Sequence, residues 1–359
     1  MRKVIKDAAV WVALTVTMAA SGAMAQAPTP AAQQQMLGLL ERGALYRDKV
    51  DWAKLRADLA ATSDPGRQES LLADAIRRAS AGHGRWISVE RQAAMRTPQG
   101  STTDATKSAS AALPAAAAQM QNPRLGRVNV GPYATDRSLP RADRFARDRQ
   151  WAQGLQAEIR SQDDGSRCGW IVDLRGNTGG NMWPMLLGVG PLLHGGGDPG
   201  QQVGTFDTGD GLQAWGYRND AVWNDDQVRI SLGASAYVLK HPDTPVAVLQ
   251  SERTASSGEA IVLAFRGRSD SRSFGHATAG YSTGNSPVQL VDGSLLLLTG
   301  SVMKDRNSVG DGSRIPPDVA AADDAETLRL AERWLLQQPA CGETSAGSVA
   351  VEPYGNGSH

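Results

Sequence analysis

The sequence is poor in cysteine and histidine and carries no net charge. Its 359 residues contain 2 Cys and 5 His, and 37 basic residues balance 37 acidic ones. A neutral chain gives no electrostatic basis for binding nucleic acid or an anionic membrane surface. The two cysteines have no CxxC spacing and are too few for a zinc cluster, so we expect no metal site.

Long hydrophobic runs are equally scarce. The apolar run Ala8–Ala20 follows a basic N-terminus and precedes small residues up to Ala25, which is the pattern of a secretory signal peptide over residues 1–25. A retained membrane anchor is the alternative, but the run is shorter than the roughly 20 apolar residues that a spanning helix needs. We therefore predict a periplasmic or secreted protein without a stable membrane span after cleavage.

The two cysteines are Cys168 and Cys341. In an oxidising compartment such an even pair is expected to form a disulfide, here between the residue before a core strand and the end of the last helix. Two buried free thiols are the alternative.

Hydrophobic periodicity divides the chain into segments. A polar spacer over 26–35 precedes a helical subdomain over 36–86, and 87–127 combines a short strand with a low-complexity loop. Strands and helices alternate over 128–340, which predicts an α/β core. The segment 341–359 is polar and is predicted to be a disordered tail.

Ser256 lies between the apolar strand predicted at Pro245–Leu249 and an apolar helix predicted to begin near Ala260. A hydroxyl at a helix N-terminus lies beside free backbone N–H groups and the positive end of the helix dipole, which suits a nucleophile in acyl transfer. Ser256 and Glu259 also match the capping-box pattern of a helix N-terminus, which accounts for both residues without a catalytic role.

A nucleophile needs a base and donors for the oxyanion. Of the five histidines, His83 is flanked by glycines at the start of a predicted strand, although a lone turn histidine has the same appearance. The glycine-rich loop Gly176–Asn181 follows a buried strand and could offer N–H groups through Gly179 and Gly180. A plain tight turn is the alternative, and no nucleotide-binding glycine motif is present.

A rival nucleophile is Ser282, because Gly280–Gly284 matches GxSxG and His194–Gly197 matches the HGGG motif of some esterases. An esterase elbow requires a helix after its serine and a histidine downstream. Here a proline and a predicted strand follow Ser282, and His359 is the one histidine downstream, so this reading is disfavoured.

Three blocks carry a family resemblance: GWIVDLRGNTGGN at 169–181, PVAVLQSERTASSGEA at 245–260 and SFGHATAGYSTGN at 273–285. Together they resemble the tail-specific, or C-terminal processing, serine peptidases, in the branch near the tricorn core and interphotoreceptor retinoid-binding protein. The resemblance implies a crotonase-like core of ββα units behind a helical subdomain, and no PDZ domain is evident.

The resemblance also implies roles for individual residues. The nucleophile falls on Ser256, and the oxyanion donors fall on Gly179, Gly180 and Ser257. Tyr281 stands where the classical branch has a catalytic lysine, which excludes a Ser-Lys dyad there.

The tricorn-like branch uses a histidine, which falls on His83. The serine that precedes that histidine in tricorn is Gly82 here. The acid that orients the histidine is expected at Asp311, with Asp305 as second choice, although the tricorn pattern has a glutamate there.

The sequence thus predicts an exported serine peptidase that acts on a peptide or protein by acyl transfer, which needs no cofactor. A catalytically silent binder of peptides or apolar ligands on the same fold is the alternative, because the branch includes retinoid-binding relatives and the lysine is missing. An acyl-CoA enzyme of the crotonase type is disfavoured by export. Substrate, cleavage specificity and oligomeric state stay open.

Overall fold

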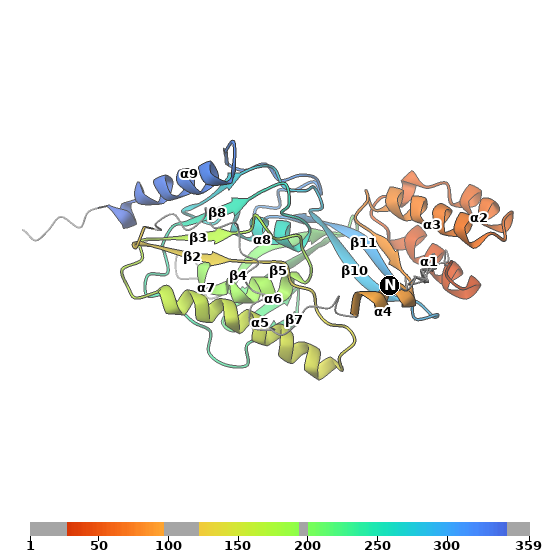
Figure 1. Ribbon diagram of the computed structural model, residues 1–359, viewed down its shortest axis with the longest axis horizontal. Helices are drawn as coiled ribbons and strands as arrows, with labels where there is room; N and C mark the ends of the chain where they lie inside the picture. Colours follow the sequence, from red (N-terminus) through yellow and green to blue (C-terminus); the bar gives the residue numbers. More distant parts are fainter. Residues whose placement is uncertain (1–26, 97–121, 194–199, 343–359) are drawn as a thin grey trace, which may run out of the picture.

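The computed structural model describes residues 27–96, 122–193 and 200–342 (Figure 1). The predicted signal peptide, most of the low-complexity loop, the HGGG segment and nearly all of the predicted tail lie outside these ranges. Within them, no helix is both long and apolar enough to cross a membrane.

The N-terminal helices form a separate lobe beside the main body of the molecule (Figure 1). They are α1 (Pro30–Gly43), α2 (Trp52–Ala60) and α3 (Pro65–Ala79), with the 3-10 turn η1 (Arg47–Lys49) between the first two. Asp51 and Asp64 cap α2 and α3 by accepting backbone N–H groups. The lobe buries Met36, Leu40 and Ile76 in one hydrophobic cluster with Leu296.

Helix α1 corrects one boundary, because the spacer predicted over 26–35 is helical from Pro30 onward. Thr29 accepts the N–H of Ala32, and Pro30 occupies the first helical position, where its missing N–H costs nothing. Ala32 and Met36 then lie on the buried face.

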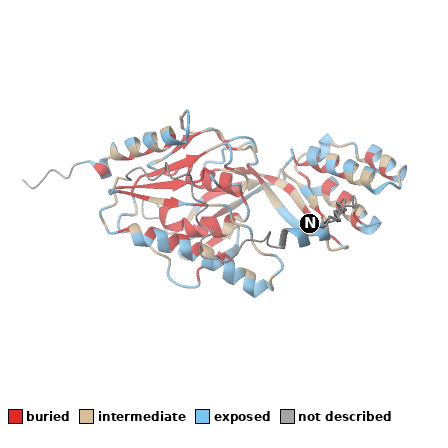
Figure 2. Cartoon of the chain, in the orientation of Figure 1, coloured by how far each residue is buried: buried red, intermediate tan, exposed pale blue. Residues whose placement is uncertain are grey.

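A five-stranded parallel sheet forms the centre of the main body. Its order is β12-β9-β8-β3-β2, built from β2 (Leu125–Asn129), β3 (Gly169–Asp173), β8 (Val246–Gln250), β9 (Ser271–Gly275) and β12 (Val319–Ala320). Strands β3 and β8 are buried along their whole length, as their apolar runs predict, and the burial extends to the polar residues Asp173 and Gln250 that end them (Figure 2).

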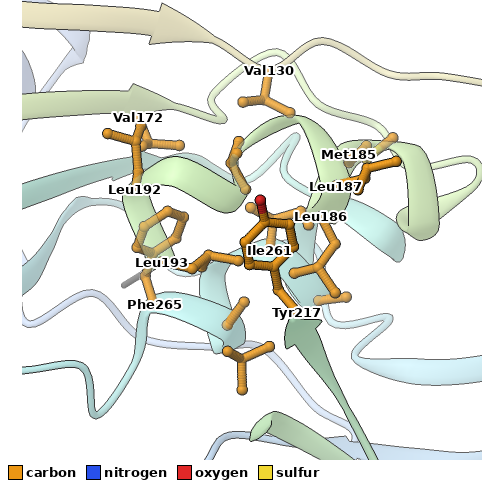
Figure 3. Close-up of a cluster of buried hydrophobic side chains, with 14 of the residues drawn as sticks. Val130, Val172, Met185, Leu186, Leu187, Leu192, Leu193, Tyr217, Ile261 and Phe265 are labelled. Atoms are coloured by element: carbon orange, nitrogen blue, oxygen red, sulfur yellow. The ribbon is translucent and has the colours of Figure 1, made fainter. Parts of the chain in front are cut away.

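Helices cover both faces of this sheet. On one face α9 (Asp324–Leu336) packs Ala331 and Leu335 against Ile171 and Leu249. On the other lie α5 (Arg141–Gln162), α6 (Met182–Gly188), α7 (Gly190–Leu193) and α8 (Ser257–Phe265). Figure 3 shows Ile261 and Phe265 of α8 in this second core.

A second, seven-stranded sheet links the main body to the helical lobe. Its strands are β1 (Arg85–Ile87), β4 (Gly200–Asp207), β5 (Leu212–Arg218), β6 (Ala221–Asn224), β7 (Gln227–Ser231), β10 (Thr283–Gln289) and β11 (Leu295–Lys304). The order is β1-β11-β4-β5-β6-β7, and β10 also pairs with β11. Long strand β11 joins β1 at one end and β4 at the other.

These elements confirm the predicted α/β class. The short strand expected at the start of 87–127 lies instead at Arg85–Ile87, and α4 (Val89–Arg96) follows it. The crotonase-like arrangement and the absence of a PDZ domain stay predictions from the resemblance.

Cys168 and Cys341 are joined by a disulfide, as predicted. The bridge ties the start of β3 to the 3-10 turn η3 (Pro339–Cys341) that follows α9. Both cysteines are buried in the core beneath α9.

Candidate active site

The candidate nucleophile lies at the carboxyl edge of the parallel sheet. Strands β3 and β8 are parallel neighbours, so the loop leaving β3 and the turn leaving β8 emerge side by side. The first carries Gly179 and Gly180, and the second carries Ser256 at the start of α8. Sheet topology therefore brings together two segments that the sequence separates.

The backbone of Ser256 is strained. Its φ of 53° and ψ of −114° lie outside the conformations that non-glycine residues normally adopt. An ordinary cap residue has extended dihedral angles, so the capping role alone does not require this conformation. Strain of this kind concentrates at functional sites, where the surrounding structure enforces it.

Glu259 holds this turn from inside the protein. Its buried carboxylate accepts the N–H of Ser256 at 2.7 Å, which supplies the capping contact predicted from sequence. It also accepts the N–H groups of Gly280 and Tyr281 and the hydroxyl of Thr278. Burial raises the pKa of Glu259, and these four donors oppose that rise.

His83 approaches Ser256 from the helical lobe. Helix α3 ends in a turn in which Ala81 and Gly82 have φ of 49° and 86° and the N–H of Gly82 donates to Arg77 O. This turn delivers His83 two residues before β1, where the side chain of Asn285 donates to the His83 carbonyl. The left-handed conformation explains a glycine at position 82.

The imidazole of His83 lies between two hydroxyls. Its Nε2 is 3.0 Å from Ser256 Oγ, and its Nδ1 is 2.6 Å from Thr283 Oγ1. The ring of Tyr281 lies beside it, with ring centroids 5.1 Å apart. Burial, with a smaller effect from the charge of Arg85, lowers the pKa of His83 to about 4, so the ring is neutral near pH 7.

The glycine loop is held rigidly against the serine turn by Asn177. The side-chain amide of this fully buried residue donates to Val130 O, and its carbonyl oxygen accepts the N–H of Gly179 at 2.9 Å. The backbone carbonyl of Asn177 accepts the N–H of Ala255. A single residue, through its side chain and its backbone carbonyl, therefore fixes the segment after β2, the glycine loop and the Ser256 turn relative to one another.

The two glycines have different surroundings. A Cβ on Gly179 would lie 2.9 Å from Ser256 Cβ, and one on Gly180 would lie 1.9 Å from Tyr133 O. Because the Gly179 N–H already donates to Asn177, the expectation that Gly179 is an oxyanion donor is corrected. In the described part of the chain no partner is seen for the N–H of Gly180 or of Ser257.

An ion-pair network supports the start of this loop. Asp173, at the end of β3, accepts hydrogen bonds from the guanidinium groups of Arg175 and Arg127. Burial opposes ionisation of Asp173, but the two guanidinium groups hold its pKa below the ordinary value. The charged cluster fixes the peptide from which the glycine loop leaves the sheet.

The structure does not bring the predicted acid to His83. Asp311 is exposed and accepts the N–H and the hydroxyl of Ser313, while Asp305 accepts the N–H groups of Asn307 and Val309. The residue at His83 Nδ1 is Thr283, which the sequence does not single out. It stands two positions after Tyr281 in a block already singled out, but nothing local marks its side chain as facing a histidine.

The rival serine is not placed for catalysis. Ser282 is 2% exposed, its hydroxyl donates to Ser313 O at 2.6 Å, and strand β10 follows it instead of a helix. The esterase reading of GxSxG is therefore wrong. Among the described residues, no group of three or more His, Cys, Asp or Glu side chains is arranged to hold a metal ion.

Comparison with known proteins finds a curated relative of this chain. A curated nisin-resistance protein from Lactococcus lactis subsp. lactis is 35% identical over 155 residues, which span 42% of this chain and 45% of that relative. The chain thus matches less than half the length of that protein.

Solved structures share the fold. A lipoprotein from Streptococcus agalactiae superposes with a TM-score of 0.63 at 23% identity and covers 85% of this chain and 94% of its own. The photosystem II D1 C-terminal processing protease superposes with a TM-score of 0.50 at 15% identity, covering 85% and 97% of the two chains.

Residues 141–321 match peptidase family S41. This stretch includes the glycine loop, Ser256 and Thr283, whereas His83 lies before it. On this match, which extends over half of the sequence, the chain belongs to peptidase family S41.

Proposed function

We propose that this protein is an exported serine peptidase that cleaves peptide bonds through an acyl-enzyme. The observation that carries the proposal is the 3.0 Å contact between His83 Nε2 and Ser256 Oγ, at a strained turn beside the glycine loop. In this mechanism His83 takes the proton of Ser256, and Ser256 Oγ attacks the substrate carbonyl carbon. His83 then returns the proton to the leaving amine.

The oxyanion formed in the attack is held by the N–H groups of Gly180 and Ser257. Gly180 is exposed at the end of its loop, and Ser257 is the first residue of α8, where N–H groups lack intrahelical partners. The Ser257 hydroxyl donates to Gly180 O at 2.8 Å, which keeps the two peptides side by side. Preorganised donors of this kind contribute about 10²–10³-fold each to turnover.

Export is part of the proposal. It rests on the signal-peptide pattern of residues 1–25 and on the Cys168–Cys341 disulfide, which is typical of proteins in oxidising compartments. The related nisin-resistance protein makes nisin one substrate to assay, beside a library of unmodified peptides.

The alternative of a silent binding module is kept because Tyr281 stands where the classical branch has its lysine. Reaction with a fluorophosphonate separates the two functions, since only a serine with a working base attacks the phosphorus. We expect stoichiometric labelling at Ser256, located by peptide mass mapping, and loss of labelling in Ser256→Ala and His83→Gln.

Two matched controls sharpen this test. Ser282→Ala removes the rival serine, and His276→Gln removes a histidine from the neighbouring block; both variants should be labelled like the wild type. An unlabelled wild-type protein that is folded and still binds peptides would make the silent binder the correct description.

A further inference from the structure

The proposed mechanism leaves open what orients His83, since Asp311 and Asp305 are engaged elsewhere. We infer that Thr283 is the positioning residue for His83, so that the site is a Ser-His-Thr relay with a neutral third member. This inference rests on the proposed function, because it assigns Thr283 a role in presenting the base to Ser256.

The contact between the two residues is short and protected. His83 Nδ1 and Thr283 Oγ1 are 2.6 Å apart, and Thr283 is 2% exposed. Water does not compete readily at such a site, so the hydrogen bond fixes the ring more firmly than an exposed one would. The opposite ring nitrogen then points at Ser256 Oγ, 3.0 Å away.

The backbone and the methyl group of Thr283 fix the direction of its hydroxyl. Thr283 begins β10 and pairs with Val302 of β11, and the strand register shifts just beyond it, between Gly284 and Asn285. Its Cγ2 methyl lies against Gly312, where an added Cβ would come within 3.0 Å. Branching at Cβ leaves few side-chain conformations, so the methyl contact directs Oγ1 toward the imidazole.

The inference assigns the Thr283 hydroxyl the role of acceptor, because the mechanism needs the tautomer whose proton is on Nδ1. A neutral imidazole has one protonated and one unprotonated nitrogen. The hydrogen-bond partners of the two nitrogens influence which one carries the proton. When Nδ1–H donates to Thr283 Oγ1, Nε2 is bare and accepts the proton of Ser256. The reverse tautomer would place an N–H against Ser256 and leave no base.

A hydroxyl orients the ring without adding negative charge. A carboxylate in this position stabilises the imidazolium that forms during attack, and Thr283 offers no such charge. This agrees with the lowered pKa of His83, about 4, for which burial and the nearby Arg85 are the causes. Tyr281 also lies beside the ring and contributes an aromatic face.

The test compares Thr283→Val, which keeps the branched shape and removes the hydroxyl, with Thr283→Ser, which keeps the hydroxyl. We expect Thr283→Val to slow fluorophosphonate labelling of Ser256 and to lower kcat by about 10²-fold with little change in KM, because the base is misoriented and partly in the wrong tautomer. Thr283→Ser should stay within about threefold of the wild type, given that the hydrogen bond is retained.

A spectroscopic measurement on the wild-type protein keeps the inference testable even if the valine variant fails to fold. Nitrogen-15 NMR of the histidine rings, assigned with His83→Gln, should show His83 neutral at pH 7 with its proton on Nδ1. In Thr283→Val the proton should move toward Nε2, which a purely structural role for the hydroxyl would not cause.

The outcomes also separate this inference from the proposed peptidase function. Labelling of the wild type at Ser256, combined with equal labelling rates in Thr283→Val, would overturn the role of Thr283 and leave the peptidase intact. A His83 proton on Nε2 in the wild type would overturn it as well. Absence of wild-type labelling would reject the peptidase itself.

Discussion

At the scale of single residues, the site depends on side chains whose partners fix their chemistry. Ser256 adopts a strained backbone conformation, His83 stands between two hydroxyls, and Asn177 uses both ends of its amide to hold the glycine loop. None of these features is a property of one amino acid alone. Each follows from where the fold places the neighbouring residue.

The pH dependence of activity is a direct test of the His83 environment. The base must be neutral, so kcat/KM should fall as the pH drops through the pKa of His83 in the free enzyme. Because that pKa is lowered to about 4 by burial and by Arg85, activity should persist well below pH 6.5, where an ordinary histidine is half protonated.

The measurement is the pH profile of kcat/KM or of the labelling rate between pH 3.5 and 8, alongside a check that the fold persists at each pH. His276→Gln should give the same acid limb as the wild type. If the acid limb of this profile had its midpoint near pH 6.5, His83 would be solvated in solution and burial would not govern its protonation.

At the scale of secondary-structure elements, the N-terminus of α8 and the segment before β10 act together through Glu259. This carboxylate accepts four donors: three backbone N–H groups and the hydroxyl of Thr278. It thereby couples the turn that carries Ser256 to the segment that carries Tyr281 and leads to Thr283.

We therefore predict that Glu259→Gln is damaging although it preserves size. The glutamine NH₂ group would face N–H donors in a fully buried position, and each buried donor left without an acceptor costs about 1–3 kcal/mol. We expect a lower free energy of unfolding by chemical denaturation and slower labelling of Ser256.

Glu252→Gln is the matched control, because Glu252 has a side chain that is 72% exposed and a contact of 3.4 Å with Arg314. An exposed pair of this kind contributes about 0–1 kcal/mol, so the control should differ little from the wild type. Equal stability of the two variants would mean that Glu259 does not hold the turn.

The sequence predicts the separate strands, turns and helices of the site but not the contacts between them. Apolar runs, capping residues and glycines act over a few positions. They therefore predict strand Val246–Gln250, the turn after it and the helix beginning at Ser257. The Thr283 contact is not readable, since it depends on the register of β10 against β11 and lies 200 residues from His83. Asp311 was expected from a family pattern, yet its side chain turns to Ser313.

At the scale of the whole molecule, the candidate site joins two bodies. His83 comes from the end of the helical lobe, whereas Ser256 and the glycine loop belong to the parallel sheet of the main body (Figure 1). Strands β1, β10 and β11 run between the two (Figure 1). The position of His83 relative to Ser256 therefore depends on this shared sheet.

The disulfide, in contrast, secures the far end of the main body. It closes a loop with a sequence separation of 173 residues at the start of β3, while the glycine loop leaves the other end of that five-residue strand, about 16 Å away. Closing a long loop restricts the unfolded chain, and removing such a bridge typically costs about 2–5 kcal/mol.

We predict that the double variant Cys168→Ser/Cys341→Ser unfolds at lower temperature and lower denaturant concentration than the wild type. Below its unfolding transition the variant should still be labelled at Ser256 by the fluorophosphonate at the wild-type rate, because β3, β8 and α8 keep their contacts without the bridge. Adding a reductant should lower the stability of the wild type to that of the variant and leave the variant unchanged. If Ser256 in the folded variant were labelled much more slowly, the bridge would be coupled to the candidate active site through β3. The two ends of the strand would then not be independent.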